Sequence, residues 1–456
     1  MNTQKLRQRI LDLAIRGKLV PQAPNDEPAS VLLDRIRAEK ERLIAEGKIK
    51  RPKAKKSTDK SHYQNFTPPF DIPASWQWVR LEDICMSILA GGDKPINFSK
   101  GKTETHTIPI FSNGIEKDGL YGYTDIATIN EESITISARG TIGFCKKRTE
   151  PYVPIIRLLV IIPSKLLSTD YVLLAISSLI NAGEGSSIPQ LTVPTIKEVY
   201  LPIPPYFEQL KITKEFEKIE NELEIINREY IQLKAYINRA KSKILDLAMQ
   251  GKLVPQDLSD EPAADMLRRV NPKAKIITYN PHSWNIPNGW CWVMVSDVFA
   301  PMKRKLPEGD NFWYIDIDSV DNKRNVAYPK NICTATAPSR ASRFTQKGDV
   351  VFSMVRPYLR NIALVPEDDC IASTGFYVFH PLDAILSKYS YILTLSSFFV
   401  DGLNSYMKGD NSPSINKDNV ESFVIPLPPL NEQKRLVVKI EELYSVLDEI
   451  ESSLRS

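Results

Sequence analysis

The chain contains one thirteen-residue sequence twice, and this feature constrains its fold more than any other. Residues Ile10–Gln22 read ILDLAIRGKLVPQ and residues Ile244–Gln256 read ILDLAMQGKLVPQ, so the copies differ at two positions. A repeat this close inside one chain indicates that one structural unit is used twice. Two other matched pairs follow in the same order, namely Trp76–Val79 with Trp290–Val293 and Pro202–Gln209 with Pro426–Gln433. The chain is therefore predicted to be a tandem duplication whose function requires two related parts.

After Pro205, apolar residues recur at alternating steps of four and three. They are Ile212, Phe216, Ile219, Leu223, Ile226, Tyr230, Leu233, Ile237, Ala240, Ile244 and Leu247. This 3.5-residue period is typical of a helix that supercoils against a partner helix. Gly251 and Pro255 then supply the expected stop signals. At about 1.5 Å per residue the helix is roughly 60 Å long, and it needs an apolar partner face to be stable.

The two ends of the chain carry the matching stripe. Its members are Leu436, Ile440, Leu443, Leu447, Ile450 and Leu454 at one end and Leu6, Ile10 and Leu13 at the other. In this alignment Ser456 corresponds to Gln232 and Met1 to Ala235, so the two ends are expected to meet and complete a second long helix. We infer an antiparallel coiled coil with a pseudo-two-fold axis. The alternative is two separate amphipathic helices, each packed on its own domain, which leaves the continued register unexplained.

Two segments of mixed composition lie between these helical stretches, and each is expected to contain one further helix, at Thr169–Ile180 and at Ser387–Leu403. We expect an α+β fold, in which two mixed α/β domains are joined by two long antiparallel coiled-coil helices in a pseudo-two-fold circular repeat. The expected parts are the N-terminal part of the split helix (1–22), a linker with a basic segment (23–75), the first domain (76–205), the central helix (206–256), a linker (257–289), the second domain (290–428) and the C-terminal helix (429–456).

A charged stretch, Arg37–Lys60, has no counterpart in the second half. Its composition predicts a solvated linker that follows a short helix. Contact between its lysines and a phosphate backbone is the alternative.

Composition excludes some classes of protein. A chain of 456 residues supports about two to four domains. Apolar runs stay well short of the roughly 20 residues that a membrane span needs, and the first nine residues are too polar for a signal peptide. Five cysteines without Cys-x-x-Cys spacing predict reduced thiols in a cytoplasmic protein. A net charge of +4 permits nucleic-acid binding through local patches without requiring it.

These motifs resemble a known family, the specificity subunits of type I restriction–modification systems. The resemblance rests on the twice-used Gly-Lys-Leu-Val-Pro-Gln helix ending, the Pro-x-Pro-Pro-x-x-Glu-Gln helix entry and the Trp-x-Trp-Val opening of each variable region. It covers nearly the whole chain and implies two target-recognition domains, each reading one half of a split, asymmetric sequence in double-stranded DNA. It further implies that the helices act as a spacer and bind two methyltransferase subunits, and that restriction subunits join the complex. The added Arg37–Lys60 segment departs from the pattern.

Motifs for catalysis are missing. Asn280–Ser283 lacks the second proline and the aromatic residue of an adenine methyltransferase loop. Gly91–Lys94 is too short for a phosphate loop and is predicted to be a turn. Asp34 with Glu46–Lys48 matches a nuclease pattern that arises often by chance. We therefore predict a non-catalytic chain without a metal or cofactor of its own. S-adenosylmethionine, ATP and magnesium are expected on the partner subunits.

Reading a DNA sequence needs side chains at base edges and basic residues on phosphates. The resemblance implies that the strand-to-loop segment of each domain faces the DNA. In the first domain the candidates in this segment are Arg139, Lys146, Lys147 and Arg148, and in the second they are Arg356 and Arg360. Neighbouring loops add Ser112 and Asn113 in the first domain, and Lys303, Arg304, Lys323 and Arg324 in the second. The alternative for each of these residues taken alone is an ordinary solvated surface position.

The outer face of the coiled coil is the expected partner surface. Six apolar residues fall off the pairing stripe, namely Leu11, Ile225, Ile231, Leu245, Val437 and Val446. They predict additional burial, either by the recognition domains or by another subunit, and the pseudo-two-fold symmetry predicts two copies of the partner.

Two alternatives remain open. One is a specificity subunit for a fused nuclease–methyltransferase, and the other is a two-headed coiled-coil scaffold that binds only protein. Salt-dependent, sequence-selective DNA binding distinguishes the scaffold from both DNA-reading candidates.

Overall fold

A computed structural model of the chain describes residues 3–23, 25–49, 66–140, 142–181 and 191–454. The chain divides into two compact units, Met1–Arg228 (unit 1) and Glu229–Ser456 (unit 2). Helix α6 (Tyr206–Met249) contributes its first half to unit 1 and its second half to unit 2. Its 44 residues confirm the prediction of one long helix.

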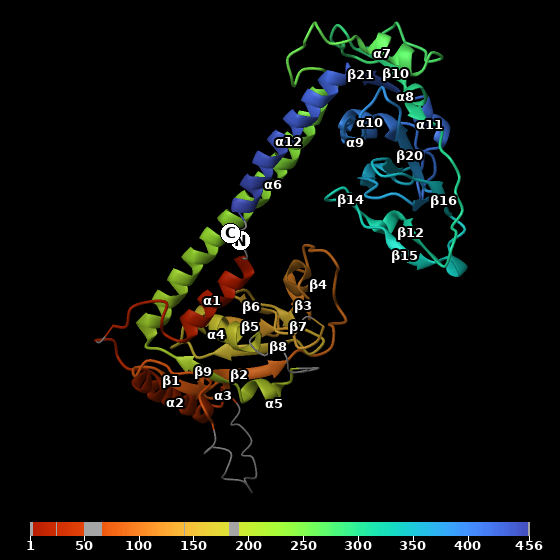
Figure 1. The fold of residues 1–456 in the computed structure, drawn as a ribbon. Helices are drawn as coiled ribbons and strands as arrows, with labels where there is room; N and C mark the ends of the chain where they lie inside the picture. Colours follow the sequence, from red (N-terminus) through yellow and green to blue (C-terminus); the bar gives the residue numbers. More distant parts are fainter. Residues whose placement is uncertain (1–2, 24, 50–65, 141, 182–190, 455–456) are drawn as a thin grey trace. The chain divides into compact units, whose positions relative to one another are not determined.

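Each half of α6 pairs with one antiparallel helix of its own unit (Figure 1). In unit 1 the partner is α1 (Thr3–Ile15), where Arg7 Nε lies 2.8 Å from Glu220 Oε2. In unit 2 it is α12 (Leu430–Ser453), and its direction follows from two ion pairs, Lys241–Asp448 and Lys234–Glu451. The predicted antiparallel pairing is thus present in both units. Met1 and Ser456, the residues expected to meet, lie outside the described residues.

The pairing stripe of α6 is largely covered, and Ile226 is its one clearly exposed member. The six off-stripe residues separate into two groups. Leu11, Leu245 and Val437 are buried in the domain cores, whereas Ile225, Ile231 and Val446 are exposed. The helix ends are therefore built into the domains, while the middle of the helices keeps exposed apolar side chains.

Unit 1 contains two principal sheets whose strands are far apart in the sequence. The first has the order β2-β8-β5-β6, with β2 (Cys85–Ala90), β8 (Leu159–Pro163), β5 (Ser133–Ile136) and β6 (Cys145–Arg148). The second has the order β4-β3-β7, with β4 (Leu120–Thr124), β3 (Ile108–Phe111) and β7 (Val153–Pro154). Helix α4 (Thr169–Asn181) follows β8, and its buried Tyr171, Val172 and Ala175 belong to the same core as β5 and β8.

Unit 2 repeats this strand order and extends it. One sheet runs β11-β20-β17-β18 and continues with β14 and β13, where the strands are β11 (Phe299–Ala300), β20 (Phe376–Pro381), β17 (Val350–Ser353), β18 (Ile362–Leu364), β14 (Val326–Ala327) and β13 (Val320–Asp321). The other runs β15-β12-β19-β16, with β15 (Lys330–Cys333), β12 (Asn311–Ile315), β19 (Cys370–Ser373) and β16 (Ala341–Phe344). The pair β3–β7 is parallel, as is β12–β19. The two domains therefore share one topology, although their sequences barely align between the repeated motifs.

A two-stranded sheet closes each domain at its joint with the helices. In unit 1, β1 (Gln77–Arg80) pairs with β9 (Tyr200–Ile203), and in unit 2, β10 (Cys291–Met294) pairs with β21 (Val424–Leu427). The registers are equivalent, because Trp78 opposes Pro202 and Trp292 opposes Pro426. Short helices follow β1 and β10, namely α3 (Leu81–Ile84) and α8 (Val295–Val298), and others precede β9 and β21, namely α5 (Val193–Lys197) and α11 (Lys417–Glu421).

Two segments differ from the predicted helices and linkers. The stretch Ser387–Leu403 is two helices, α9 (Ser387–Leu395) and α10 (Ser397–Asn404), because Ser396 has an extended backbone and its hydroxyl caps α10. The expected linkers also contain helices, α2 (Ala29–Ala45) and α7 (Ala263–Val270), which bury Leu32, Leu33 and Ile36 and their counterparts Met266 and Leu267. The first part of Arg37–Lys60 is therefore helical rather than linker, and residues 50–65 lie outside the described part.

Candidate nucleic-acid interface

A buried glutamate anchors each domain to its helix. In unit 1, Trp76 Nε1–H donates to Glu208 Oε2 at 3.0 Å, and Gln22 donates to the other carboxylate oxygen. In unit 2, Trp290 Nε1–H and Gln256 Nε2–H donate to the two oxygens of Glu432 at 2.8 and 2.7 Å. Burial raises the pKa of both carboxyl groups. The three repeated motifs of the sequence therefore meet at one point in each unit.

The glutamine that follows each glutamate fixes the proline-rich turn. Gln209 Nε2 donates to the carbonyl of Pro204 at 2.9 Å, and its Oε1 accepts from the backbone N–H of Ser168 at 2.9 Å. Gln433 makes the same two bonds in unit 2, to the carbonyl of Pro428 and from the N–H of Leu386. Both side chains are fully buried. Each domain is thus held to its helix in the same way.

Glycine is required where the repeated helix ends. Gly17 and Gly251 both have φ of +66°, a conformation that L side chains rarely adopt. A Cβ at Gly251 would lie 2.2 Å from Pro287 Cγ, and one at Gly17 would lie 2.5 Å from Pro73 Cγ. The prediction that Gly251 ends the helix is correct, and the same residue also lets the chain approach the domain closely.

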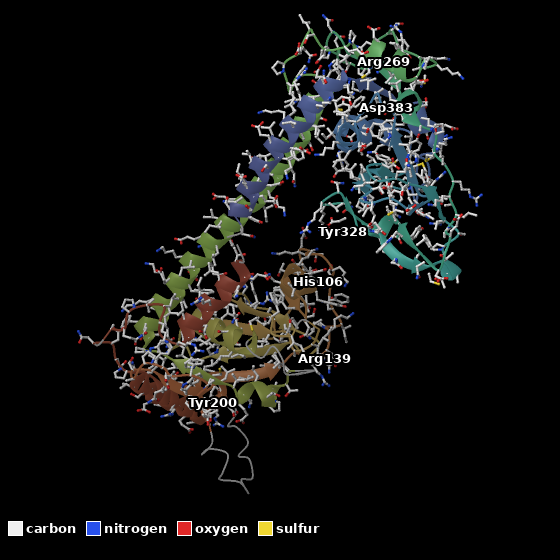
Figure 2. The ribbon with its side chains drawn as sticks, viewed as in Figure 1. His106, Arg139, Tyr200, Arg269, Tyr328 and Asp383 are labelled. Atoms are coloured by element: carbon white, nitrogen blue, oxygen red, sulfur yellow. The ribbon has the colours of Figure 1, made fainter. Side chains whose placement is uncertain are left out.

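In unit 1, Arg139 is exposed after the end of β5, at the edge of the unit (Figure 2). The neighbouring loop is held to this position by Asn113, whose Nδ2 donates to the carbonyl of Ile156 at 2.7 Å and whose Oδ1 accepts from Ala138 N at 2.8 Å. Ser112 lies beside it, and its N–H donates to the carbonyl of Gly119. The amide of Asn113 therefore has an architectural role that its sequence position did not reveal.

The basic strand β6 contributes less to the surface than predicted. Arg148 is only 9% exposed; its guanidinium donates to Thr135 Oγ1 and to the carbonyl of Asp118, and lies 3.6 Å from the centre of the Phe111 ring. Burial lowers the pKa of Arg148. Burial and these contacts disfavour the predicted DNA contact by Arg148, because its guanidinium is engaged inside the unit. The two lysines of β6 form ion pairs, Lys147 with Asp170 at 2.8 Å and Lys146 with Asp118 at 3.1 Å.

In unit 2 two turns form one surface. The first, between β13 and β14, carries the exposed Lys323 and Arg324, whose backbone N–H groups donate to Asp321 Oδ1. The second is the 3-10 turn Pro357–Leu359, flanked by Arg356 and Arg360. The turns are tied together by Asn322 Nδ2, which donates to the carbonyl of Leu359 at 2.9 Å, and by Asn325 Nδ2, which donates to the carbonyl of Arg360 at 3.0 Å. Four of the predicted residues are thus brought together.

The predicted pair Lys303 and Arg304 lies elsewhere in unit 2. It follows β11, which is at the opposite edge of the six-stranded sheet from β13. The carbonyl of Lys303 accepts from Phe344 N, and the backbone of Arg304 forms an isolated antiparallel β-bridge with that of Arg343 in β16. Both side chains are exposed but do not belong to the surface formed by the two turns.

The turn that carries Arg356 has a structural equivalent in unit 1. Ser353 N–H donates to the carbonyl of Asn361, as Ser137 N–H does to that of Phe144, which aligns Gly140 and Gly143 with Arg356 and Arg360. All four residues have positive φ, between 48° and 88°. Arg356 and Arg360 therefore occupy backbone positions that favour glycine. The sequence placed these two strand-to-loop segments in equivalent positions, but the match of Gly140 with Arg356 and of Gly143 with Arg360 became visible only in the structure.

Sequence reasoning missed three exposed side chains on these surfaces. In unit 1, Arg157 is exposed beside Ile156, the residue whose carbonyl binds Asn113. In unit 2, Tyr358 and Leu359 are 45% and 43% exposed at the tip of the 3-10 turn. The only signal in the sequence was the placement of Tyr358 and Leu359 between two arginines.

Among the described residues, no group of three or more His, Cys, Asp and Glu side chains is arranged to hold a metal ion. In the same part of the chain, no helix has the length and apolar character needed to cross a membrane.

These features define an internally duplicated protein with two domains of one topology, each anchored to a helix in the same way and each carrying different side chains on its loops. The chain belongs to the family described as the type I restriction modification DNA specificity domain, which matches residues 73–235 and 287–456. Both matched ranges include a domain and part of a long helix.

Individual relatives agree with this assignment. The chain is similar to the Type I restriction enzyme EcoEI specificity subunit of Escherichia coli, with 26% identity over 559 aligned positions that cover 99% of this chain and 91% of the relative. The EcoAI specificity subunit of the same organism has 26% identity with the same coverage. A solved structure described as bearing on complex assembly and conformational transition of the type I R-M system shares the fold, with a TM-score of 0.53 and 17% identity over 85% of this chain and 96% of that chain.

Proposed function

We propose that this chain is the non-catalytic sequence-specificity subunit of a type I restriction–modification complex, and that each unit reads one half of a bipartite, asymmetric DNA site. The observation that carries the proposal is the pair of equivalent positive-φ positions after matched strands, Gly140 and Gly143 in unit 1 and Arg356 and Arg360 in unit 2. They occupy the same place in the same topology but differ in sequence. A duplicated frame with different loop residues is what reading two different half-sites requires.

The charges on these loops support contact with a polyanion. Arg139 and Arg157 are exposed in unit 1, and Lys323, Arg324 and Arg356 are exposed in unit 2. Each phosphate that a cation neutralises releases counterions, so binding weakens as salt rises. Exposed lysines and arginines on loops are therefore assigned to phosphates or base edges, and the buried Arg148 is excluded from this role.

Two equivalent grooves support the binding of two methyltransferase subunits. In unit 1 a groove of about 560 Å³ lies between α4 and the helices, with Leu11, Leu174 and Phe216 in its lining. In unit 2 a groove of about 640 Å³ is lined by the matched residues Leu245, Ile392 and Ile440. Two similar surfaces in one chain are expected to bind two copies of one partner. Ile225 in unit 1, and Ile231 and Val446 in unit 2, are further exposed apolar side chains on these helices.

The test is DNA binding by the complex isolated from the host through a tag on this chain. Affinity for duplexes with fully random central positions is measured at several salt concentrations, and the bound sequences are determined. We expect a split consensus of two short half-sites and an affinity that falls steeply with salt. Native mass spectrometry of the same sample is expected to show two methyltransferase subunits per chain. A complex that binds no particular sequence would contradict the proposal and favour a protein-binding scaffold.

A further inference from the structure

The joined turns of unit 2 present an apolar tip in a basic setting. Tyr358 and Leu359 are adjacent and 45% and 43% exposed, and Val326 and Tyr328 of the neighbouring turn region are 41% and 55% exposed. Figure 2 shows Tyr328 at the edge of unit 2. Exposed apolar side chains in a cluster indicate a binding surface more often than chance. This cluster differs from the grooves beside the helices, because none of its members lines them.

The tip is held rigidly by the residues around it. Arg356 and Arg360 have φ of 48° and 55°, so a left-handed residue stands on each side of the 3-10 turn. Their guanidinium groups donate to backbone carbonyls, Arg356 to that of Asn411 at 2.9 Å and Arg360 to that of Leu395 at 2.6 Å. These arginines therefore fix the turn with part of their hydrogen-bonding capacity. Non-glycine residues in this conformation carry strain, which is common where a loop serves binding.

The charges beside the tip indicate what kind of partner it meets. Lys323 and Arg324 are exposed on the turn that is hydrogen-bonded to it. The carboxylate nearest to them in sequence, Asp321, accepts both of their backbone N–H groups, and these bonds lower its pKa. An apolar tip flanked by cations fits a duplex, in which phosphates line the groove and the bases form its floor.

We propose that Tyr358 and Leu359 contact the bases of the half-site read by unit 2, while Lys323 and Arg324 bind the flanking phosphates. The inference rests on the proposed function and goes beyond it by naming the base-contacting side chains and their apolar chemistry. Tyrosine stacks on bases, and leucine packs on thymine methyl groups or between base steps. In unit 1 the equivalent turn has glycine at both left-handed positions, and its Ile142 lines the groove beside the helices. The Tyr-Leu tip at this turn therefore has no counterpart at Gly140, Ile142 and Gly143 of unit 1.

Three variants of the tagged complex test the assignment on the random duplex pool. Tyr358→Ala is expected to weaken binding to the selected site by about tenfold or more and to relax the consensus in one half-site only, with an unchanged salt slope. Tyr358→Phe keeps the ring and is expected to bind like the wild type. Lys323→Ala combined with Arg324→Ala is expected to weaken all duplexes alike and to reduce the salt slope by about 2. Tyr279→Ala, a change at another exposed tyrosine of unit 2, is the matched control and should have no effect.

The outcomes separate this inference from the function on which it rests. If the wild type selects a split site and Tyr358→Ala selects the same site with the same affinity, the base contact is wrong. If Tyr358→Ala leaves DNA binding intact but loses a methyltransferase subunit from the purified complex, the tip binds protein instead. If the wild type selects no sequence, the proposed function itself fails. Thermal unfolding of Tyr358→Ala is expected to match the wild type, because the side chain is exposed.

Discussion

Glu208 and Glu432 occupy matched positions in the first turns of α6 and α12, and each accepts a tryptophan N–H and a glutamine N–H. The sequence identified both glutamates as repeated, together with the tryptophans and glutamines that bind them. It could not show that the three motifs converge, since the glutamate lies 132 residues from the tryptophan and 186 from the glutamine in unit 1, and 142 and 176 residues from them in unit 2. Convergence depends on the fold of the whole domain between them.

Replacing Glu432 by Gln tests the anchor in unit 2. Glutamine offers one acceptor oxygen in place of two, so a buried donor loses its partner at a cost of about 1–3 kcal/mol. Burial raises the pKa of Glu432 above its ordinary 4.5. Protonation of Glu432 therefore favours the folded state. The stability that it adds to the wild type is fully present below pH 4.5 and is lost as pH rises through the folded-state pKa. The deficit of the variant should accordingly shrink as pH rises above 4.5.

Urea unfolding of the wild type and Glu432→Gln at a series of pH values measures this deficit. Glu229→Gln, at an exposed position of α6, is the control. A deficit that stays constant across the series would show that the glutamate does not titrate differently in the folded chain.

Gly251→Ala is predicted to destabilise unit 2 for two separable reasons. The left-handed backbone costs a non-glycine residue about 1–2 kcal/mol, and the new Cβ meets Pro287 at 2.2 Å. Gly309→Ala has a similar φ of +75° with nothing within 4 Å, so it reports the backbone cost alone. Chemical denaturation should rank Gly251→Ala as clearly more damaging than Gly309→Ala. Equal losses would mean that the close approach to Pro287 relaxes without cost.

At the scale of elements, helical periodicity could be predicted well and loop roles could not. The period of 3.5 located α6 and both partner helices, because apolar spacing alone determines which face of a helix is buried. It also identified off-stripe residues, but it could not distinguish Leu245, which the domain buries, from Ile231, which stays exposed. The candidate DNA-contacting loops were chosen largely from their arginines, yet Arg148 is buried and the Asn113 side chain binds the backbone. Such roles depend on contacts made by distant segments.

Leu245→Ala and Ile231→Ala form a matched pair on α6. Leu245 is buried in the unit 2 core, so its truncation is expected to cost about 2–4 kcal/mol of unfolding free energy. Ile231 is exposed, so its truncation should change stability by less than about 0.5 kcal/mol. We expect Ile231→Ala instead to weaken retention of the methyltransferase subunits in a pull-down. Normal retention of the methyltransferase subunits by Ile231→Ala would remove Ile231 from the proposed partner surface.

At the scale of the whole molecule, the chain combines one duplicated frame with two different sets of loops. The sequence repeats predicted the duplication. The shared strand order of the two domains became visible only in the structure, because strand pairing does not require matching residues. We propose that α6, which is common to both units, sets the number of base pairs between the half-sites.

Deleting one heptad, Leu223–Glu229, tests this proposal. The deletion removes two helical turns, or about 10 Å, which corresponds to about three base pairs at roughly 3.4 Å each. We expect recognition to be lost or the spacer to shorten, with both half-sites unchanged, as determined from the methylated motif in cells. Retention of the original spacer would refute the role of α6 as a ruler.

The central claim, that the chain directs methylation to a split DNA sequence, is tested most directly by mapping DNA methylation across the genome of the native host. The map is compared between cells with the gene intact and cells in which it is deleted, with the intact gene restored in a third strain. We predict that one motif of two short half-sites, separated by a fixed spacer, loses methylation on deletion and regains it on restoration. An unchanged map, with the protein and its methyltransferase shown to be expressed, would contradict the account.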